Sequence, residues 1–232
     1  MSGNPNLHWD KVPRLWPGER VYIVGGGPSL KGFNWERLHG LNVLALNAAA
    51  WAMPQGVARV AMFVDRPFYK LFRSRMKRFV LGECGGRLVL DVTNRPRPAD
   101  YEGIWWDHWA LRIKRLEGIR NQGISTNPAQ VCYNRGCGGA ALNVAYLLGA
   151  KEIVLLGYDG STKAGLNWHD EYEDGRRRTA LITPLNSYWL AVDKAMRACA
   201  EQLEQLGVKV YNTNMNSAHG CFPKVPLEDL ID

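Results

Sequence analysis

The chain alternates short apolar runs with stretches in which apolar residues recur at helical spacing. Short runs that are rich in Val, Ile and Leu and bounded by polar residues or glycine are typical of buried β-strands. They predict strands at residues 20–24, 41–46, 57–64, 87–90, 152–159 and 208–211. Helical spacing occurs at residues 68–79, 140–148 and 186–206. Strands that alternate with helices predict an α/β fold, in which a mainly parallel sheet carries helices on both faces.

Two stretches interrupt this alternation. Residues 94–134 contain a proline-rich turn, a group of tryptophans and a basic run, so we expect a loop-rich insertion there. Residues 160–183 are polar and contain several glycines, and we expect a lid-like loop over a functional site. No strong boundary separates either stretch from its neighbours, which predicts a single domain over residues 1–232.

A glycine turn follows the first predicted strand and is formed by Gly25, Gly26 and Gly27, with Pro28 and Ser29 after it. Glycines let backbone N–H groups approach a ligand, and a helix that starts near Pro28 or Ser29 would add its positive dipole end. This combination suits a phosphate group. The alternative is a plain turn between a strand and a helix, since the pattern is neither G-x-G-x-x-G nor a Walker loop.

A second glycine pair, Gly138 and Gly139, stands at the start of the predicted helix 140–148. It is consistent either with anion binding at the helix N-terminus or with close packing of the helix. Polar residues also follow further strands directly, at Asn47, Asp65 and Asp159. In parallel sheets ligands bind outside the carboxyl ends of the strands, so we expect these residues to line one rim.

The formal net charge is +7 and the pI is about 9.2, which favours anionic partners such as nucleotides or nucleic acid. Five cysteines are widely spread and form no C-x-x-C pair, so neither a disulfide framework nor a zinc site is indicated. The N-terminal residues lack the basic and apolar regions of a secretory signal, and no run reaches the roughly 20 apolar residues of a membrane span. We therefore expect a cytoplasmic protein.

Two stretches of the sequence resemble the motifs of a known family. The first glycine turn, from Val24 to Leu30, resembles the Gly-x-Gly-Pro-Ser-Leu motif of bacterial lipooligosaccharide sialyltransferases. Their relatives share it: motility-associated glycosyltransferase-like factors, phage proteins and archaeal-type 6-hydroxymethylpterin pyrophosphokinases. Asn47 is similar to the family's asparagine after the second strand, and residues 138–159 resemble its second block. The resemblance covers roughly residues 20–66 and 136–212.

The resemblance implies a Rossmann-like α/β fold that binds a nucleotide. It places the phosphates near the first glycine turn and the base or ribose near Gly138 and Gly139. His169 is similar in order to the family's proposed general base. The sialyltransferases grip the phosphate with two lid tyrosines, for which this chain offers Tyr172 and the arginines from Arg176 to Arg178. Members of the family often form oligomers, so the resemblance makes a homo-oligomer one option, although nothing in the sequence identifies an interface.

Three functions remain open at this point, and glycosyl transfer is placed first. In that reaction a nucleotide sugar is the donor, His169 removes a proton from the acceptor, and Asp170 or Glu171 orients the imidazole ring. The acceptor is a glycan, a small molecule or a modified nucleic acid. In the alternative, a pyrophosphokinase or nucleotidyl-type transferase, Asp65 and Asp159 would hold Mg²⁺.

The third function is a non-catalytic one, the binding of a nucleotide or a nucleic acid by an accessory protein. Basic residues would contact the phosphates, namely Arg73, Arg75, Lys77, Arg78, Arg112, Lys114 and Arg115. Basic stretches are more often a solvated face of a protein, which weighs against this function.

Overall fold

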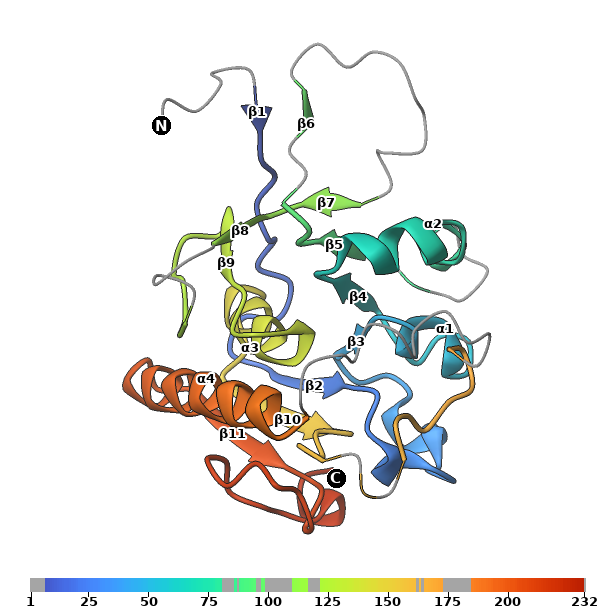
Figure 1. Cartoon of the computed structure of the whole chain (residues 1–232), viewed down its shortest axis with the longest axis vertical. Coiled ribbons are helices and arrows are strands. Elements are labelled where there is room, and N and C mark those ends of the chain that lie inside the picture. Colours follow the sequence, from blue (N-terminus) through green and yellow to red (C-terminus); the bar gives the residue numbers. More distant parts are fainter. Residues whose placement is uncertain are drawn as a thin grey trace.

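A computed structural model describes residues 7–80, 86, 88–94, 97–98, 110–116, 122–161, 163, 165–172 and 185–231. Its centre is a seven-stranded sheet with the order β11-β10-β2-β3-β4-β5-β7, in which every neighbouring pair is parallel (Figure 1). The strands are β2 (Arg20–Val24), β3 (Val43–Leu46), β4 (Val60–Phe63), β5 (Leu88–Asp91), β7 (Leu111–Arg112), β10 (Glu152–Leu156) and β11 (Lys209–Asn212).

Helices cover both faces of this sheet, as Figure 1 shows. Their bounds are α1 (Ala49–Ala52), α2 (Arg66–Val80), α3 (Cys137–Leu147) and α4 (Leu185–Gln205). Successive residues of a strand point to opposite faces, so Ile23 packs in the core beneath α3 and α4, whereas Val24 packs in the core beneath α1 and α2. The α/β, Rossmann-like fold class is confirmed. In the described residues no helix has the length and apolar character needed to span a membrane.

Short elements complete the fold. Two small sheets pair β1 (Leu7–His8) with β6 (Arg97–Pro98), antiparallel, and β8 (Lys114–Leu116) with β9 (Gln130–Cys132), parallel. The described residues also include the single-turn 3₁₀ helices η1 (Pro28–Leu30), η2 (Trp35–Leu38) and η6 (Leu227–Asp229).

The expected insertion at 94–134 contains more regular structure than the sequence indicates. It contributes β7, which lies at one edge of the main sheet, and both strands of the β8–β9 pair. These strands have only two or three residues of mixed polarity, so they show no alternating pattern. These segments become strands because their backbones pair with strands that are remote in the sequence. Residues 95–96, 99–109 and 117–121 of the insertion lie outside the described residues.

Two buried asparagines fasten the insertion to α3. The side chain of Asn143 accepts hydrogen bonds from the N–H groups of Ser125 (3.0 Å) and Cys132 (2.9 Å) and donates to the Ser125 carbonyl (2.9 Å). Asn134 exchanges bonds with Gly123 in both directions and also donates to the Gly139 carbonyl. These amides satisfy backbone groups that no regular ladder could reach.

Replacing Asn143 by Ala should destabilise the fold strongly, because each backbone group left buried and unsatisfied costs about 1–3 kcal/mol. We expect a loss of at least about 2 kcal/mol in the free energy of unfolding, measured by urea denaturation. Asn127→Ala is the matched control, since Asn127 is exposed and accepts one bond from the Ala129 N–H. Equal losses in the two variants would contradict the assigned role of Asn143.

Candidate functional site

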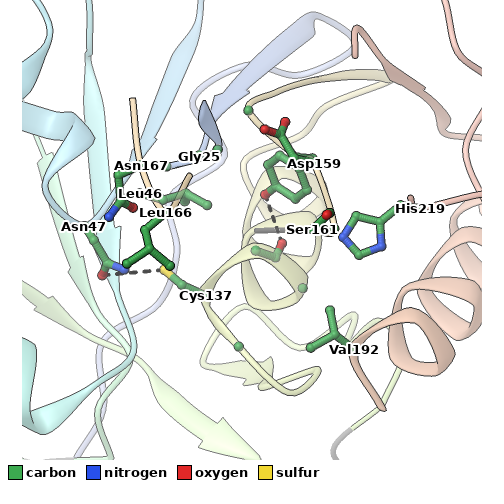
Figure 2. A pocket seen from close by; sticks show the side chains of 18 of the residues that line it. Gly25, Leu46, Asn47, Cys137, Asp159, Ser161, Leu166, Asn167, Val192 and His219 are labelled. Atoms are coloured by element: carbon green, nitrogen blue, oxygen red, sulfur yellow. Dashed lines mark hydrogen bonds between the residues drawn. The ribbon is translucent and has the colours of Figure 1, made fainter. Parts of the chain in front are cut away.

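A cavity of about 420 Å³ lies at the carboxyl ends of β2, β3, β4 and β10, at the rim where the sequence places its polar strand ends (Figure 2). We call it the sheet-end cavity. Its volume falls in the range of about 300–1,000 Å³ that is usual for small-molecule sites. The walls come from the first glycine turn, the N-terminus of α3, the residues after β10, the segment 166–172, one face of α4 and the loop after β11.

The cavity brings together most of the residues that the sequence selects. Those that line it are Gly25, Gly26, Gly27, Pro28, Asn47, Asp65, Gly138, Gly139, Asp159, His169 and Tyr172. Ser29 is the exception, because its side chain is exposed and does not line the cavity. Arg176, with Arg177 and Arg178, lies outside the described residues, as does most of the expected lid.

The first glycine turn differs from the amide-lined phosphate loop that its sequence suggests. The N–H of Gly25 donates to Leu156 O (2.8 Å) and the N–H of Gly27 donates to Gly157 O (3.0 Å). A Cβ on Gly27 would lie 2.5 Å from that carbonyl oxygen, so the glycine is required for close contact between two backbones. Among the described residues, none bonds the N–H of Gly26, which is therefore the amide that the turn offers to a ligand.

The prediction of a helix that starts near Pro28 or Ser29 is also wrong. The chain there forms only the three-residue η1, which is too short to present a useful dipole. The Ser29 N–H (2.9 Å) and its Oγ (2.5 Å) both donate to the carboxylate of Asp159, so they are already bonded. Ser29 therefore helps to hold the cavity wall.

Asp159 connects three segments at this rim. Besides the two bonds from Ser29, its Oδ1 accepts a hydrogen bond from Asn214 Nδ2 (2.9 Å), and its backbone oxygen accepts one from the N–H of Ala218 (2.8 Å). Ser29 follows β2, whereas Asn214 and Ala218 follow β11. One carboxylate thus joins the ends of β2, β10 and β11.

The N-terminus of α3 forms the opposite wall. Gly136 is its N-cap and has no side chain to bond the first amides, and no bond within the described residues uses the N–H of Gly138 or Gly139. A helix N-terminus with such amides favours an anion. Close packing also explains one glycine, because a Cβ on Gly139 would lie 2.4 Å from the Cβ of Asn134. Both interpretations of this glycine pair therefore have structural support.

His169 is buried in the segment that crosses the first glycine turn. Trp168 fastens this segment: its Nε1 donates to Gly25 O (2.9 Å) and its N–H donates to Gly26 O (3.1 Å). The His169 ring contacts the rings of Trp168 (centroids 4.9 Å apart) and Tyr172 (5.0 Å) edge to face. The Tyr172 hydroxyl accepts a hydrogen bond from the N–H of Ala48 (3.3 Å), which ties the segment to the start of α1.

The carboxylates expected to orient His169 have other positions. Glu171 accepts a hydrogen bond from Trp51 Nε1 (2.8 Å) and forms an ion pair with Arg75 of α2. Asp170 is exposed to solvent. Of the contacts within the described residues, the rings of Trp168 and Tyr172 pack against the His169 ring. The position of Glu171 is a tertiary effect, because Trp51 and Arg75 are remote from the segment in sequence.

The sequence analysis did not select His219, which also lines the cavity and is only 4% exposed. Its Nδ1 lies 3.6 Å from Oδ1 of Asp193 on α4. Burial lowers the pKa of His219 below the usual 6.5, although the charges of Asp193 and Asp159 partly oppose this shift. A lone histidine in a C-terminal loop carries no local signal; only packing against α4 reveals its partner.

Metal ligation has limited support. No group of three or more His, Cys, Asp or Glu side chains in the described part of the chain could hold a metal ion. Asp65 and Asp159 line the same cavity, but Ser29 and Asn214 already bond the Asp159 carboxylate.

The sequence matches no family model and no curated protein. Solved structures do match. CST-II, a sialyltransferase crystallised with CMP and a trisaccharide acceptor, aligns over 89% of this chain and 86% of its own, with 20% identity and a TM-score of 0.53. CstII from Campylobacter jejuni with the substrate analogue CMP-3FNeuAc gives 18% identity and 0.51 over 89% and 85%.

The monofunctional α-2,3-sialyltransferase Cst-I from Campylobacter jejuni also matches, with 17% identity and a TM-score of 0.53 over 89% of this chain and 80% of its own. The chain has the fold of these sialyltransferases. The sequence analysis named four groups of proteins that share the glycine motif, and the structures compared here belong to one of them, the sialyltransferases.

Gly27→Ala should destabilise the protein by about 1–3 kcal/mol, the usual cost of overpacking, because its Cβ would meet the backbone of Gly157. Gly26→Ala is the matched control. There the nearest atom is the side-chain Oδ1 of Asn167, 2.9 Å away, which can rotate aside. Thermal unfolding of the two variants measures the difference. A Gly27→Ala protein as stable as Gly26→Ala would contradict the close contact.

Proposed function

We propose that the protein is a nucleotide-sugar-dependent glycosyltransferase of the sialyltransferase type. The observation that carries this proposal is the convergence of the first glycine turn, the α3 N-terminus and His169 on one cavity at the carboxyl ends of parallel strands. Two of the sialyltransferase structures with this fold contain CMP or the substrate analogue CMP-3FNeuAc, which supports a nucleotide ligand here.

In this proposal the donor phosphate lies between the N–H of Gly26 and the amides of Gly138 and Gly139. Their residues line the cavity, and no bond within the described residues uses these three amides. The positive end of α3 adds to their attraction for negative charge. Asp159 has a positioning role here, because its carboxylate is occupied in joining strand ends.

His169 acts as the general base. An acceptor hydroxyl forms a bond to the anomeric carbon of the donor sugar, while the bond from that carbon to the phosphate oxygen breaks and its electron pair leaves with the nucleotide. His169 takes the hydroxyl proton, for which the unperturbed imidazole pKa of about 6.5 is well suited. The aromatic rings of Trp168 and Tyr172 hold the imidazole in place during this step.

The first experiment identifies the donor and tests His169. A thermal-shift panel of nucleotides and nucleotide sugars, run with and without EDTA, names the donor by the rise in melting temperature. For that donor, His169→Ala should lower turnover by roughly 10²–10⁴-fold and leave donor affinity nearly unchanged. His39→Ala is the control, since His39 is exposed and its nearest carboxylate is that of Glu36 in η2.

Three outcomes would contradict the proposal. They are the absence of any nucleotide that raises the melting temperature, full turnover by His169→Ala, and turnover that disappears completely with EDTA. The last result would favour the metal-dependent pyrophosphokinase chemistry instead.

A second experiment uses a cysteine as a reporter of ligand binding. Cys137 is half-buried, stands at the first turn of α3 and lines the cavity, whereas Cys132 and Cys199 are buried elsewhere in the core. Burial raises the pKa of Cys199 to about 12, so its thiol is inert near neutral pH. A bound nucleotide should slow alkylation of Cys137 several-fold, as measured by peptide mass spectrometry. Unchanged alkylation at saturating nucleotide would place the ligand elsewhere.

A further inference from the structure

Asn167 belongs to the segment that crosses the first glycine turn, and its backbone is held beside that turn. The next residue, Trp168, donates from its N–H to Gly26 O (3.1 Å) and from its Nε1 to Gly25 O (2.9 Å). The Trp168 ring also packs against the ring of Trp35 in η2, with the centroids 4.6 Å apart. These contacts fix the place of Asn167 independently of any ligand.

The side chain of Asn167 lies against Gly26 and lines the sheet-end cavity. A Cβ on Gly26 would lie 2.9 Å from Asn167 Oδ1 and 3.9 Å from its Cγ. Figure 2 shows this side chain on the same side of the cavity as Asn47 and Leu166. Asn167 is half-buried, and no hydrogen bond within the described residues uses its side-chain amide. The amide can therefore rotate and present either its NH₂ group or its oxygen to a ligand.

The charges on the cavity wall explain why a neutral donor is useful here. The described lining includes the carboxylates of Asp65 and Asp159, and none of its residues is a lysine or an arginine. Within this part of the wall, a phosphate would depend on neutral donors such as the three unbonded backbone amides. A carboxamide adds a hydrogen-bond donor without adding a charge. Asn167 can supply one because it touches Gly26, which carries one of these amides.

We propose that Asn167 is a further catalytic residue, whose side-chain NH₂ group donates a hydrogen bond to the donor phosphate beside the N–H of Gly26. This inference rests on the proposed function. When the bond between the anomeric carbon and the phosphate oxygen breaks, its electron pair goes to that oxygen, so the phosphate gains negative charge. A donor that is already in place stabilises this charge more in the transition state than in the bound substrate. Asn167 neither takes nor gives a proton in this step.

Calorimetry with CMP, UMP, AMP and GMP tests the contact with phosphate, using the one that the wild-type protein binds most tightly. Asn167→Ala should weaken its binding about tenfold or more, because hydrogen bonds to charged groups are strong. Asn167→Asp keeps an acceptor, loses the donor and adds a negative charge, so it should weaken binding further than the alanine variant. If Asn167→Asp binds as tightly as the wild type, the amide accepts a bond from a hydroxyl, and the phosphate contact is overturned.

Turnover of the matching nucleotide sugar gives an independent readout. Because charge develops as the phosphate leaves, Asn167→Ala should lower kcat roughly 10²-fold, which is more than it raises KM. The pH dependence of kcat should keep the midpoint set by His169, since a carboxamide does not titrate. A substitution that merely displaced the segment would move this midpoint as well. An unchanged kcat with a raised KM would overturn the catalytic role.

Asn216→Ala is the matched control. Asn216 is exposed on the loop after β11 and does not line the cavity, and its backbone N–H donates to Asn214 Oδ1, a bond that alanine retains. This variant should bind and turn over the donor like the wild type. Both alanine variants should melt within about 2 °C of the wild type, because neither replaced side chain makes a hydrogen bond within the described residues.

The failure of this inference is distinguishable from the failure of the proposed function. If the wild-type protein binds none of these nucleotides or their sugar conjugates, the proposed function fails and this inference fails with it. If the wild type binds and turns over a donor, but folded Asn167→Ala and Asn167→Asp match it in affinity and in kcat, only this inference is overturned.

Discussion

The carboxylate of Asp159 is the contact on which the site depends. It accepts two hydrogen bonds from Ser29 after β2 and one from Asn214 after β11, and it stands at the end of β10 itself. Hydrogen bonds to a charged acceptor are among the stronger ones in proteins. They bring three loops from distant parts of the sequence to one rim. The close backbone contact between Gly27 and Gly157 is possible only because both residues lack side chains.

The two glycine segments differ in how many of their backbone N–H groups are already hydrogen-bonded. In the first turn, the N–H groups of Gly25 and Gly27 donate to neighbouring backbone, and no bond within the described residues uses the N–H of Gly26. At the start of α3, Gly138 and Gly139 retain their amides because the helix begins there without a capping side chain. Within the described residues, α3 therefore has two such unbonded amides at the cavity, whereas the motif that is more conspicuous in the sequence has one. Two histidines then face the same cavity from different elements, His169 from the segment before α4 and His219 from the loop after β11.

The resemblance and the fold agree on a sialyltransferase-like architecture, at identities of 17–20% to the structures compared. At such low sequence identity, proteins keep the same fold while individual side-chain contacts change. Here the His169 ring packs against Trp168 and Tyr172, while Glu171 binds Trp51 and Arg75 on the other side of the segment. The segment that carries the proposed base is thereby fixed to α1 and α2. Function at such a site follows from the geometry of its residues rather than from the fold alone.

Local patterns in the sequence were enough to determine the parallel α/β architecture, six strands of the sheet within a few residues, and the polar positions at the strand ends. The bounds of β2 were predicted without error, because four residues of strong β preference, from Val21 to Val24, end at a glycine turn. Periodicity and turn chemistry are properties of neighbouring residues, so the sequence alone reveals them. Strand β7, the bonding of Ser29 to Asp159, the partners of Glu171 and the pairing of His219 with Asp193 depended on the tertiary structure. Each joins residues distant in sequence, and only packing and backbone pairing decide which of them meet.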